Sequence, residues 1–312
     1  MLVGITGATG FIGGALMNKC LSRDYNVRIL TRQYSSSRLI PSSVEVVNAD
    51  LTEDSDGIDE FVKGLDVLFH CAGELNDKSK MHEVHVKGTS RLLAAAQGKI
   101  GHWVQLSSVG AYGPPQGPAN INRVVTENSA PWPQGVYETT KTQSDELVMQ
   151  ACEHGSFSYS IVRPSNVFGA DMPNQSLRSL GAMMARQLFF YVGRPGALAT
   201  YVHVDDVVEV LLRCGIDPRA KGEVFNISND CLLEDMVNGM ASALGVARPW
   251  LRLPEPFVRL VTSVAENVVR FPLTQERIDT LVSRTKYPNV KLEQKLDFTP
   301  QVNVPSAIGE VL

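Results

Sequence analysis

The 312-residue chain lacks paired cysteines, basic runs and long apolar segments. Its cysteines are odd in number and form no C-x-x-C pair, which argues against both a disulfide framework and a zinc site. They are Cys20, Cys71, Cys152, Cys214 and Cys231. No apolar run reaches the roughly 18–20 residues of a membrane span, and no signal-like segment precedes the first apolar run at residue 2. We therefore expect a soluble, unprocessed protein of the reducing cytoplasm.

Charge is close to balanced. Lysine and arginine number 29 against 33 acidic residues, for a formal net charge of -4. Because nucleic-acid binding depends on basic patches, this balance argues against nucleic acid as the main partner. An anionic small molecule would have to be held by a few placed groups.

The N-terminal stretch has the pattern of a dinucleotide-binding turn. Residues 2–6 form a short apolar run, and Gly7, Gly10 and Gly13 then lead into a helical pattern. Glycines let the backbone approach a pyrophosphate, and the N-terminus of the helix supplies N–H groups and the positive end of its dipole. The cofactor is predicted to lie on residues 7–13.

Strand and helix patterns alternate through the first half of the chain and predict a doubly wound α/β fold with a parallel sheet. Further strands are expected at residues 26–31, 44–47, 66–70, 102–107, 159–163 and 223–227. We expect a dinucleotide domain over residues 1–169, completed by about 198–229. Residues 170–197 and 230–312 are expected to form a smaller C-terminal substrate-binding lid domain, with two helices in its second part.

The end of the second strand bears on the choice of cofactor. Enzymes that use NAD place an acid about 20 residues beyond the glycines, whereas an arginine there accommodates a 2′-phosphate. This chain has Thr31 and Arg32, no acid between residues 29 and 38, and Ser35, Ser36, Ser37 and Arg38 close by. The pattern favours NADP, with NAD as the alternative.

Tyr137 and Lys141 are one helical turn apart, so their side chains share a face. An ammonium about 4 Å from a phenol favours its ionised form by about 4 kcal/mol at an effective dielectric of 20. We therefore expect Lys141 to lower the pKa of Tyr137 well below its usual value of about 10, which suits a proton donor or acceptor. Ser108 follows the strand at residues 102–107, at the carboxyl edge where ligands of such sheets gather.

Four motifs occur in the order found in one enzyme family. They are T-G-A-T-G-F-I-G at residues 6–13, S-x-x-x-Y-G at 108–113, Y-x-x-x-K at 137–141 and R-P-S-N-V-F-G at 163–169. The set resembles the extended branch of the short-chain dehydrogenase/reductase superfamily, which includes nucleotide-sugar epimerases and dehydratases. The resemblance implies a Rossmann-type sheet, a homodimer, and a catalytic Ser108, Tyr137 and Lys141.

The same resemblance implies a set of cofactor contacts. Asp50 and Leu51 match the positions beside the adenine ring, and Cys71, Ala72 and Gly73 match small residues that leave room for the diphosphate. The complete set is Gly7, Thr9, Gly10, Phe11, Ile12, Gly13, Arg32, Asp50, Leu51, Cys71, Ala72, Gly73, Tyr137, Lys141, Pro164 and Ser165. His85 stands where the family motif N-V-x-G-T has asparagine. His82 lies three residues before it, but there is no third ligand, so no metal site is predicted.

Substrate-side residues are fewer. Val109 and Gly110 occupy the places where dehydratases carry Asp-Glu, which disfavours a dehydratase. Epimerases place an arginine just before the strand near residue 201, where this chain has only small and apolar residues. Substrate binding is predicted for Ser108, Asn166, Arg252 and Arg284. The family counterpart of Asn166 contacts a diphosphate.

The first hypothesis is an NADP-dependent oxidoreductase that reduces a 4-keto nucleotide sugar or oxidises the matching alcohol. One alternative is a nucleotide-sugar 4-epimerase with retained NAD. A second is a reductase of a steroid-like or flavonoid-like ketone, and a third is a non-catalytic NADP sensor or assembly protein. The sensor reading is disfavoured because Tyr137 and Lys141 are both present.

Overall fold

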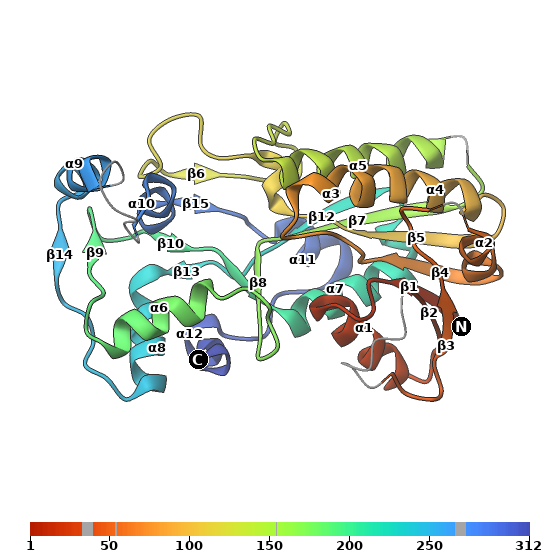
Figure 1. Cartoon of the computed structure of the whole chain (residues 1–312), viewed down its shortest axis with the longest axis horizontal. Coiled ribbons are helices and arrows are strands. Elements are labelled where there is room, and N and C mark those ends of the chain that lie inside the picture. The colour runs from red at the N-terminus through yellow and green to blue at the C-terminus, as the bar shows by residue number, and fades with distance from the viewer. Residues whose placement is uncertain (33–39, 54, 154, 266–272) are drawn as a thin grey trace.

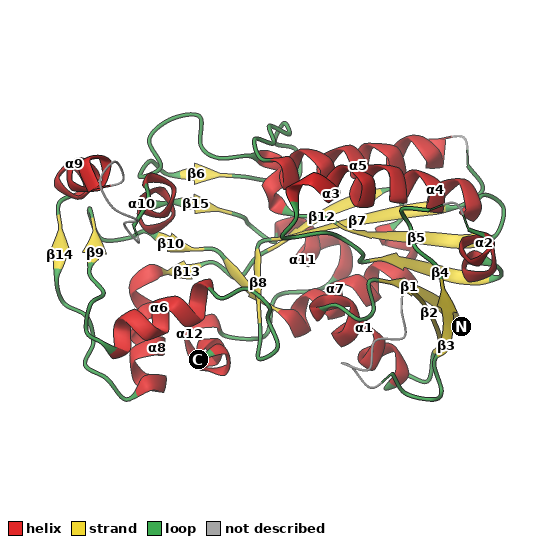
Figure 2. Ribbon diagram, viewed as in Figure 1, coloured by secondary structure: helices red, strands yellow, loops and turns green. Residues whose placement is uncertain are grey.

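A seven-stranded parallel sheet lies at one end of the molecule and a smaller, mainly helical part at the other (Figure 1). The computed structural model describes residues 1–32, 40–53, 55–153, 155–265 and 273–312. Figure 2 shows the same division, with helices on both faces of the sheet. This part of the chain matches the predicted Rossmann-type α/β class.

The sheet has the strand order β3-β2-β1-β4-β5-β7-β12. Its strands are β1 (Leu2–Thr6), β2 (Asn26–Thr31), β3 (Glu45–Asn48), β4 (Leu65–His70), β5 (Ile100–Leu106), β7 (Ser158–Pro164) and β12 (Glu223–Ile227). The order runs outward in both directions from the pair β1 and β4, so the connections reverse direction there. In open α/β sheets this reversal opens a crevice at the carboxyl ends of the two strands, where ligands bind.

Each face of the sheet is covered by its own core. One core joins α1 (Phe11–Leu21) and α7 (Val204–Ile216) to alternate residues of the central strands, such as Val3 and Ile5. The other places Phe61, Leu92 and Val148, from three helices, over Trp103. The helices and turns on that side are α2 (Asp56–Val62), α3 (Lys78–His82), the π-helical turn η1 (Glu83–Lys87), α4 (Gly88–Ala96), η2 (Val109–Tyr112) and α5 (Val136–Glu153).

The smaller part has a separate core, built on buried residues such as Met184, Met236 and Met240. Its helices are α6 (Ser176–Ala185), α8 (Leu233–Leu244), α9 (Glu255–Ala265), α10 (Gln275–Val282), α12 (Val304–Ala307) and the turn η4 (Ile308–Val311). Outside the large sheet, the described residues form four two-stranded pairs. They are β8 (Asn166–Phe168) with β11 (Tyr201–His203), β10 (Leu198–Ala199) with β13 (Cys231–Leu232), β9 (Tyr191–Val192) with β14 (Arg252–Leu253), and β6 (Arg123–Val124) with β15 (Thr285–Lys286).

The prediction of two helices in residues 230–312 is wrong, because the structure has α8, α9, α10, α11 and α12 there. Prolines do not interrupt α9 or α12. Pro256 and Pro305 instead occupy first turns, of α9 and α12, where a missing N–H removes no helical hydrogen bond.

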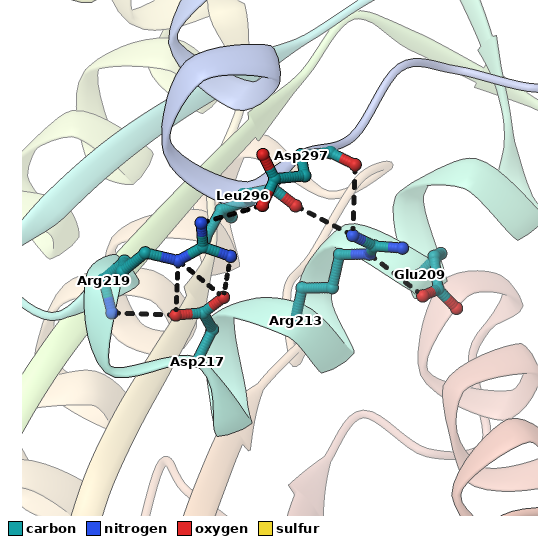
Figure 3. Close-up of polar contacts among 6 residues, drawn as sticks. All are labelled: Glu209, Arg213, Asp217, Arg219, Leu296 and Asp297. Atoms are coloured by element: carbon teal, nitrogen blue, oxygen red, sulfur yellow. Dashed lines mark hydrogen bonds and ion pairs between the residues drawn. The ribbon is translucent and has the colours of Figure 1, made fainter.

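The helix α11 (Val290–Leu296) returns to the large sheet, where Leu292 and Leu296 are buried in the first core. Polar contacts fasten it to α7 and to the turn η3 (Pro218–Ala220), as Figure 3 shows. The domain division at residues 169, 198–229 and 230 stays a prediction, and α11 packs with the dinucleotide part although that prediction assigned it to the lid. Among the described helices, none combines the length and the apolar character that a bilayer crossing requires.

Candidate active site

The glycine turn lies directly against the end of β4. Gly7 has a φ of +70°, and a Cβ atom there would lie 2.7 Å from the backbone nitrogen of Ala72. A Cβ at Gly13 would lie 2.2 Å from the Gly7 carbonyl oxygen. The Ala72 N–H donates to Thr6 Oγ1 at 3.2 Å. The structure thus places the predicted cofactor segments 7–13 and 71–73 side by side at the β1/β4 crevice.

This geometry suits a dinucleotide. Gly10 is the N-cap of α1 and has no side chain to stand between the first turn of the helix and a phosphate. Side chains at Gly7 and Gly13 would close the approach or push the turn apart. Phe11 and Ile12 are half-buried in the first helical turn, and Thr9 is exposed beside it.

The remaining predicted cofactor residues lie at strand ends. Arg32 is exposed just after β2, while Ser35, Ser36, Ser37 and Arg38 fall outside the described residues. Asp50 Oδ1 accepts hydrogen bonds from the Thr52 N–H and hydroxyl, both at 2.8 Å, and Leu51 is buried next to it. Pro164 ends β7, and the buried Ser165 accepts a hydrogen bond from the Ser228 hydroxyl at 2.7 Å.

Ser107 and Ser108 follow β5 but have different surroundings. Ser107 is buried and donates to Asp145 Oδ2 at 2.7 Å. Ser108 is half-buried, and its Oγ accepts the Gly110 N–H at 3.1 Å as the N-cap of η2. Of the two hydroxyls, Ser107 is therefore committed to the interior, and Ser108 is the one available to a substrate.

The turn that follows Ser108 is held by Arg123, which lies in the Pro/Gly-rich loop at residues 114–135. The Arg123 guanidinium donates to the carbonyls of Tyr112 and Gly113, at 2.9 and 2.8 Å. Gly113 has a φ of +62°, and a Cβ there would lie 1.9 Å from the Trp132 carbonyl oxygen. The sequence analysis missed Arg123, since its only signal is one charge in a loop otherwise poor in charged residues.

Tyr137 and Lys141 lie on the first turns of α5, but the predicted effect of the lysine on the tyrosine pKa is wrong for this arrangement. The buried Lys141 ammonium donates to the Leu106 carbonyl at the end of β5. Burial, followed by the negative charges of Glu138 and Asp145, raises the pKa of Tyr137 to about 12. Tyr137 is thus held in its protonated form.

A buried carboxylate one turn beyond Lys141 completes the site. Asp145 accepts hydrogen bonds on Oδ2 from Arg163 Nε and Nη2, at 3.1 and 3.0 Å. Arg163 Nη1 donates to the Tyr112 hydroxyl at 3.1 Å, and that hydroxyl donates to Asn226 Oδ1 at 2.9 Å. Burial lowers the pKa of Lys141, and the Asp145 charge opposes that shift. The sequence analysis missed Asp145, although its four-residue spacing from Lys141 was a usable signal.

Arg252 and Arg284, the predicted substrate residues of the lid, both contact the turn at residues 193–196. Arg252 forms an ion pair with Glu234 at 2.7 Å and lies over the Tyr191 ring, 4.6 Å from its centroid. Arg284 donates to the Pro195 carbonyl, and a Cβ at Gly196 would lie 3.2 Å from its Nη1. The Gly196 N–H points to the same Glu234 carboxylate at 3.4 Å. The two arginines therefore flank Gly196.

Asn166 is exposed at the start of β8, where its amide donates to the Thr200 carbonyl at 3.1 Å. The structure therefore places it at the junction of the sheet and the lid. Within the described ranges, no three His, Cys, Asp or Glu side chains gather in a way that could hold a metal ion.

Two known proteins resemble this chain in sequence over most of its length. The chain is 28% identical over 299 residues to sterol demethylase protein B of Methylococcus capsulatus, covering 92% of this chain and 87% of that protein. It is 26% identical over 288 residues to 4-hydroxy-2-methyl-3-oxo-4-farnesyl-3,4-dihydroquinoline-1-oxide ketoreductase of Stigmatella aurantiaca, covering 89% and 83%.

The fold is also that of solved epimerase structures. The UDP-glucuronic acid 4-epimerase of Bacillus cereus, in complex with NAD, superposes with a TM-score of 0.76 over 100% of this chain and 97% of that one, at 17% identity.

A family model matches residues 3–228, which contain the glycine turn, Ser108, Tyr137, Lys141 and Arg163. The family is one of NAD(P)-dependent oxidoreductase enzymes, in agreement with the dinucleotide site. By this match, the chain belongs to the NAD-dependent epimerase/dehydratase family.

Proposed function

We propose that the chain is an NADP(H)-dependent oxidoreductase that interconverts a ketone and a secondary alcohol on a large apolar substrate of the sterol kind. The observation that carries this proposal is the apolar rim, which we define as Leu75, Trp132 and Val136. Their side chains are 58%, 54% and 44% exposed. Exposed apolar side chains beside a polar site are typical of ligand-binding surfaces.

Each residue of the rim is tied to the catalytic groups. Val136 directly precedes Tyr137. The Trp132 N–H donates to the Ala111 carbonyl at 2.9 Å, within the turn that follows Ser108. Leu75 follows Glu74 at the end of the cofactor segment beside β4. The two sequence relatives act, by their names, on a sterol and on a farnesylated ketone, which supports the same substrate class.

Each site residue has its own role in the proposed hydride transfer. A bound nicotinamide would supply or accept the hydride. Tyr137, kept protonated by burial and by the nearby carboxylates, would donate its proton to the carbonyl oxygen during reduction. The Ser108 hydroxyl would donate a hydrogen bond to the same oxygen, and Lys141 would face the nicotinamide ribose. Arg32 would favour NADP over NAD by pairing with the 2′-phosphate.

The first sequence hypothesis, a nucleotide-sugar oxidoreductase, remains the second candidate. The grouping of Arg252 and Arg284 around Gly196 favours it, because two guanidinium groups can bind a diphosphate. Glu234 already neutralises Arg252, however, and this places the candidate second. A nucleotide-sugar epimerase would use the same two arginines and is part of this second candidate. The homodimer and the cytoplasmic location remain predictions.

Incubation with NADPH and either cholestanone or a UDP-4-keto sugar, and a separate incubation with UDP-glucose, distinguish the candidates. We expect NADPH to be consumed in proportion to the cholestanol formed. Interconversion of UDP-glucose and UDP-galactose with no net redox change would instead favour an epimerase. Tyr137→Phe is the control, since it should slow either reaction by about 10²–10⁴-fold. An enzyme that reduces neither ketone class would contradict the proposal.

Arg284→Ala sharpens the choice of substrate. It should leave cholestanone reduction unchanged and weaken UDP-glucose binding if that ligand binds at all. An equal loss of activity with cholestanone would mean that Arg284 also contacts the apolar substrate, and would contradict the assignment of Arg284 to a diphosphate.

A further inference from the structure

His85 lies between the cofactor segment and the catalytic helix. It belongs to η1, a single π-helical turn between α3 and α4, and its side chain is 1% exposed. Such turns widen the helix by one residue and redirect a side chain, and they are frequent at functional sites. Here the turn packs against α5, which carries Tyr137 and Lys141.

Both ring nitrogens of His85 have partners on different elements. Nε2 lies 2.8 Å from the Glu74 backbone N–H, which can only donate. Nε2 must therefore be the unprotonated nitrogen, and the neutral ring carries its proton on Nδ1. Nδ1 lies 2.8 Å from Thr140 Oγ1, which itself lies 2.8 Å from the Val136 carbonyl. The ring thus donates a hydrogen bond to Thr140, and the Thr140 hydroxyl donates one to the Val136 carbonyl.

The same ring also contacts the catalytic tyrosine. The centroids of His85 and Tyr137 are 5.6 Å apart, with the planes at 83°, an edge-to-face arrangement. A Cβ at Gly73 would lie 3.3 Å from His85 Nε2, so the ring also lies close to the cofactor segment. One imidazole therefore contacts Glu74, Thr140 and Tyr137 and lies beside Gly73.

The charges around His85 keep it neutral. Burial and the Lys141 ammonium lower its pKa to about 4, against smaller opposing contributions from the Glu74 backbone and carboxylate. The buried His70 is also within electrostatic reach, and burial followed by the charges of Lys141 and His85 lowers its pKa. A proton added to Nε2 would face the Glu74 N–H and break that contact. The bridge therefore requires the neutral ring.

We propose that His85 is a positioning residue, a neutral imidazole that ties the segment after β4 to the first turn of α5 and so fixes Tyr137 relative to the cofactor. The inference rests on the proposed function for the role of Tyr137, but the tautomer and the bridge do not depend on the substrate.

Three substitutions separate the two ends of the bridge. His85→Phe keeps a flat ring beside Tyr137 and removes both hydrogen bonds. His85→Gln keeps an acceptor for the Glu74 N–H, and His85→Asn keeps a donor for Thr140. Because a misplacement of about 1 Å can cost about 100-fold in rate, we expect each to lower kcat for cholestanone reduction by about 10–100-fold, with little change in KM.

Thr140→Val removes the far end of the bridge without touching His85. The double variant His85→Phe/Thr140→Val should lose no more activity than His85→Phe alone, since both changes break one connection. His102→Phe is the matched control. His102 is also buried, and its two ring nitrogens contact Ser158 and Ser160, at 2.7 and 3.0 Å, between β5 and β7. Its loss should lower stability and leave kcat unchanged.

Two readouts do not need turnover. NMR of ¹⁵N-histidine-labelled protein should show His85 protonated on Nδ1 only and not titrating until the pH nears about 4. NADPH titrations should show a raised dissociation constant in His85→Phe and Thr140→Val and not in His102→Phe. If the wild type reduces no ketone, the proposed function fails while these readouts still decide the role of His85. A proton on Nε2, an unchanged NADPH affinity in the folded variants, or a wild-type kcat in any of the three His85 variants would overturn the inference.

Discussion

Two arginine–aspartate networks in this chain use the same groups in opposite surroundings. In the site network, defined as Ser107, Asp145, Arg163, Tyr112 and Asn226, the central ion pair has exposures of only 5% for Arg163 and 0% for Asp145. In the surface network of Figure 3, Arg219 is 50% exposed and binds Asp217 and Asp297, which are 20% and 73% exposed. The distances are similar, at 3.0 Å inside and 2.7 and 2.8 Å outside.

The carboxylates nevertheless respond in opposite directions. Burial is the largest influence on Asp145 and raises its pKa, although Arg163 and Ser107 oppose the change. The hydrogen bond from Arg219 is the largest influence on Asp217 and lowers its pKa. At the surface, the attraction of the arginine therefore stabilises the ionised carboxylate. In the interior, the same attraction mainly offsets the cost of desolvating the two charges. The buried pair therefore need not add to the net free energy of unfolding, but removal of either partner alone would leave an uncompensated buried charge.

Arg163→Met should have the largest effect on stability. It leaves Asp145 buried without its counter-charge, and loss of one partner of a buried pair costs about 3–5 kcal/mol in free energy of unfolding. Urea denaturation measures this loss, with Arg219→Met as the matched surface control. The double variant Arg163→Met/Asp145→Leu should recover part of the loss, and equal losses for the single and double variants would contradict the account.

Tyr137→Phe should affect rate rather than stability. It removes the transferable proton while keeping the ring that contacts His85, so turnover should fall by about 10²–10⁴-fold. NADPH binding and the urea midpoint should stay near those of the wild type. Near-normal turnover would mean that another group donates the proton.

The pH dependence of reduction tests the raised pKa of Tyr137. Since the acid form is the active one in reduction, the rate should stay level through neutral pH and show no fall below about pH 10, because the raised pKa of Tyr137 lies near 12. In the direction of alcohol oxidation the rate should instead rise with pH, because Tyr137 must first lose its proton. An alkaline limb well below pH 10 in reduction would show that Lys141 lowers the tyrosine pKa in the working enzyme, as the sequence alone predicted.

Arg32→Ala tests the charge that the proposed function assigns to the 2′-phosphate of NADP. It should weaken NADPH binding by about 1–3 kcal/mol, the range for a hydrogen bond to a charged group, and leave NADH nearly unaffected. Titration of both cofactors into wild type and variant measures this. A wild type that prefers NADH would remove the argument for NADP.

Asp217→Asn should have the smallest effect, because its contacts are exposed to water and salt. The folded pKa of Asp217 lies below its ordinary value of 3.8, so its contribution is complete above that value and is lost as the pH falls through the lowered pKa. Asparagine at this position can still cap η3, so the substitution removes the charge and keeps the cap. The difference in unfolding free energy from wild type should shrink in acid and in high salt, and a difference that persists in both would indicate a packing role instead.

Sequence patterns predicted the sheet well because strand periodicity is local. The strands at residues 2–6, 26–31 and 223–227 were predicted at their observed bounds, and the others lie within about two residues of prediction. Only two helices were predicted after residue 230, fewer than the structure has there, since segments such as α9 and α12, of 11 and 4 residues, owe their stability to packing against their neighbours rather than to an internal pattern.

The sequence by itself determined the dinucleotide turn, the order of the motifs and the pairing of Tyr137 with Lys141 on one helix face, because each depends on residues close together in the chain. Only the tertiary structure decided their electrostatics. Asp145 and Arg163 are 18 residues apart, and His85 reaches Thr140 across 55. Burial at these contacts directs Lys141 to a carbonyl and raises the pKa of Tyr137, because the cost of desolvating a charge depends on everything packed around it.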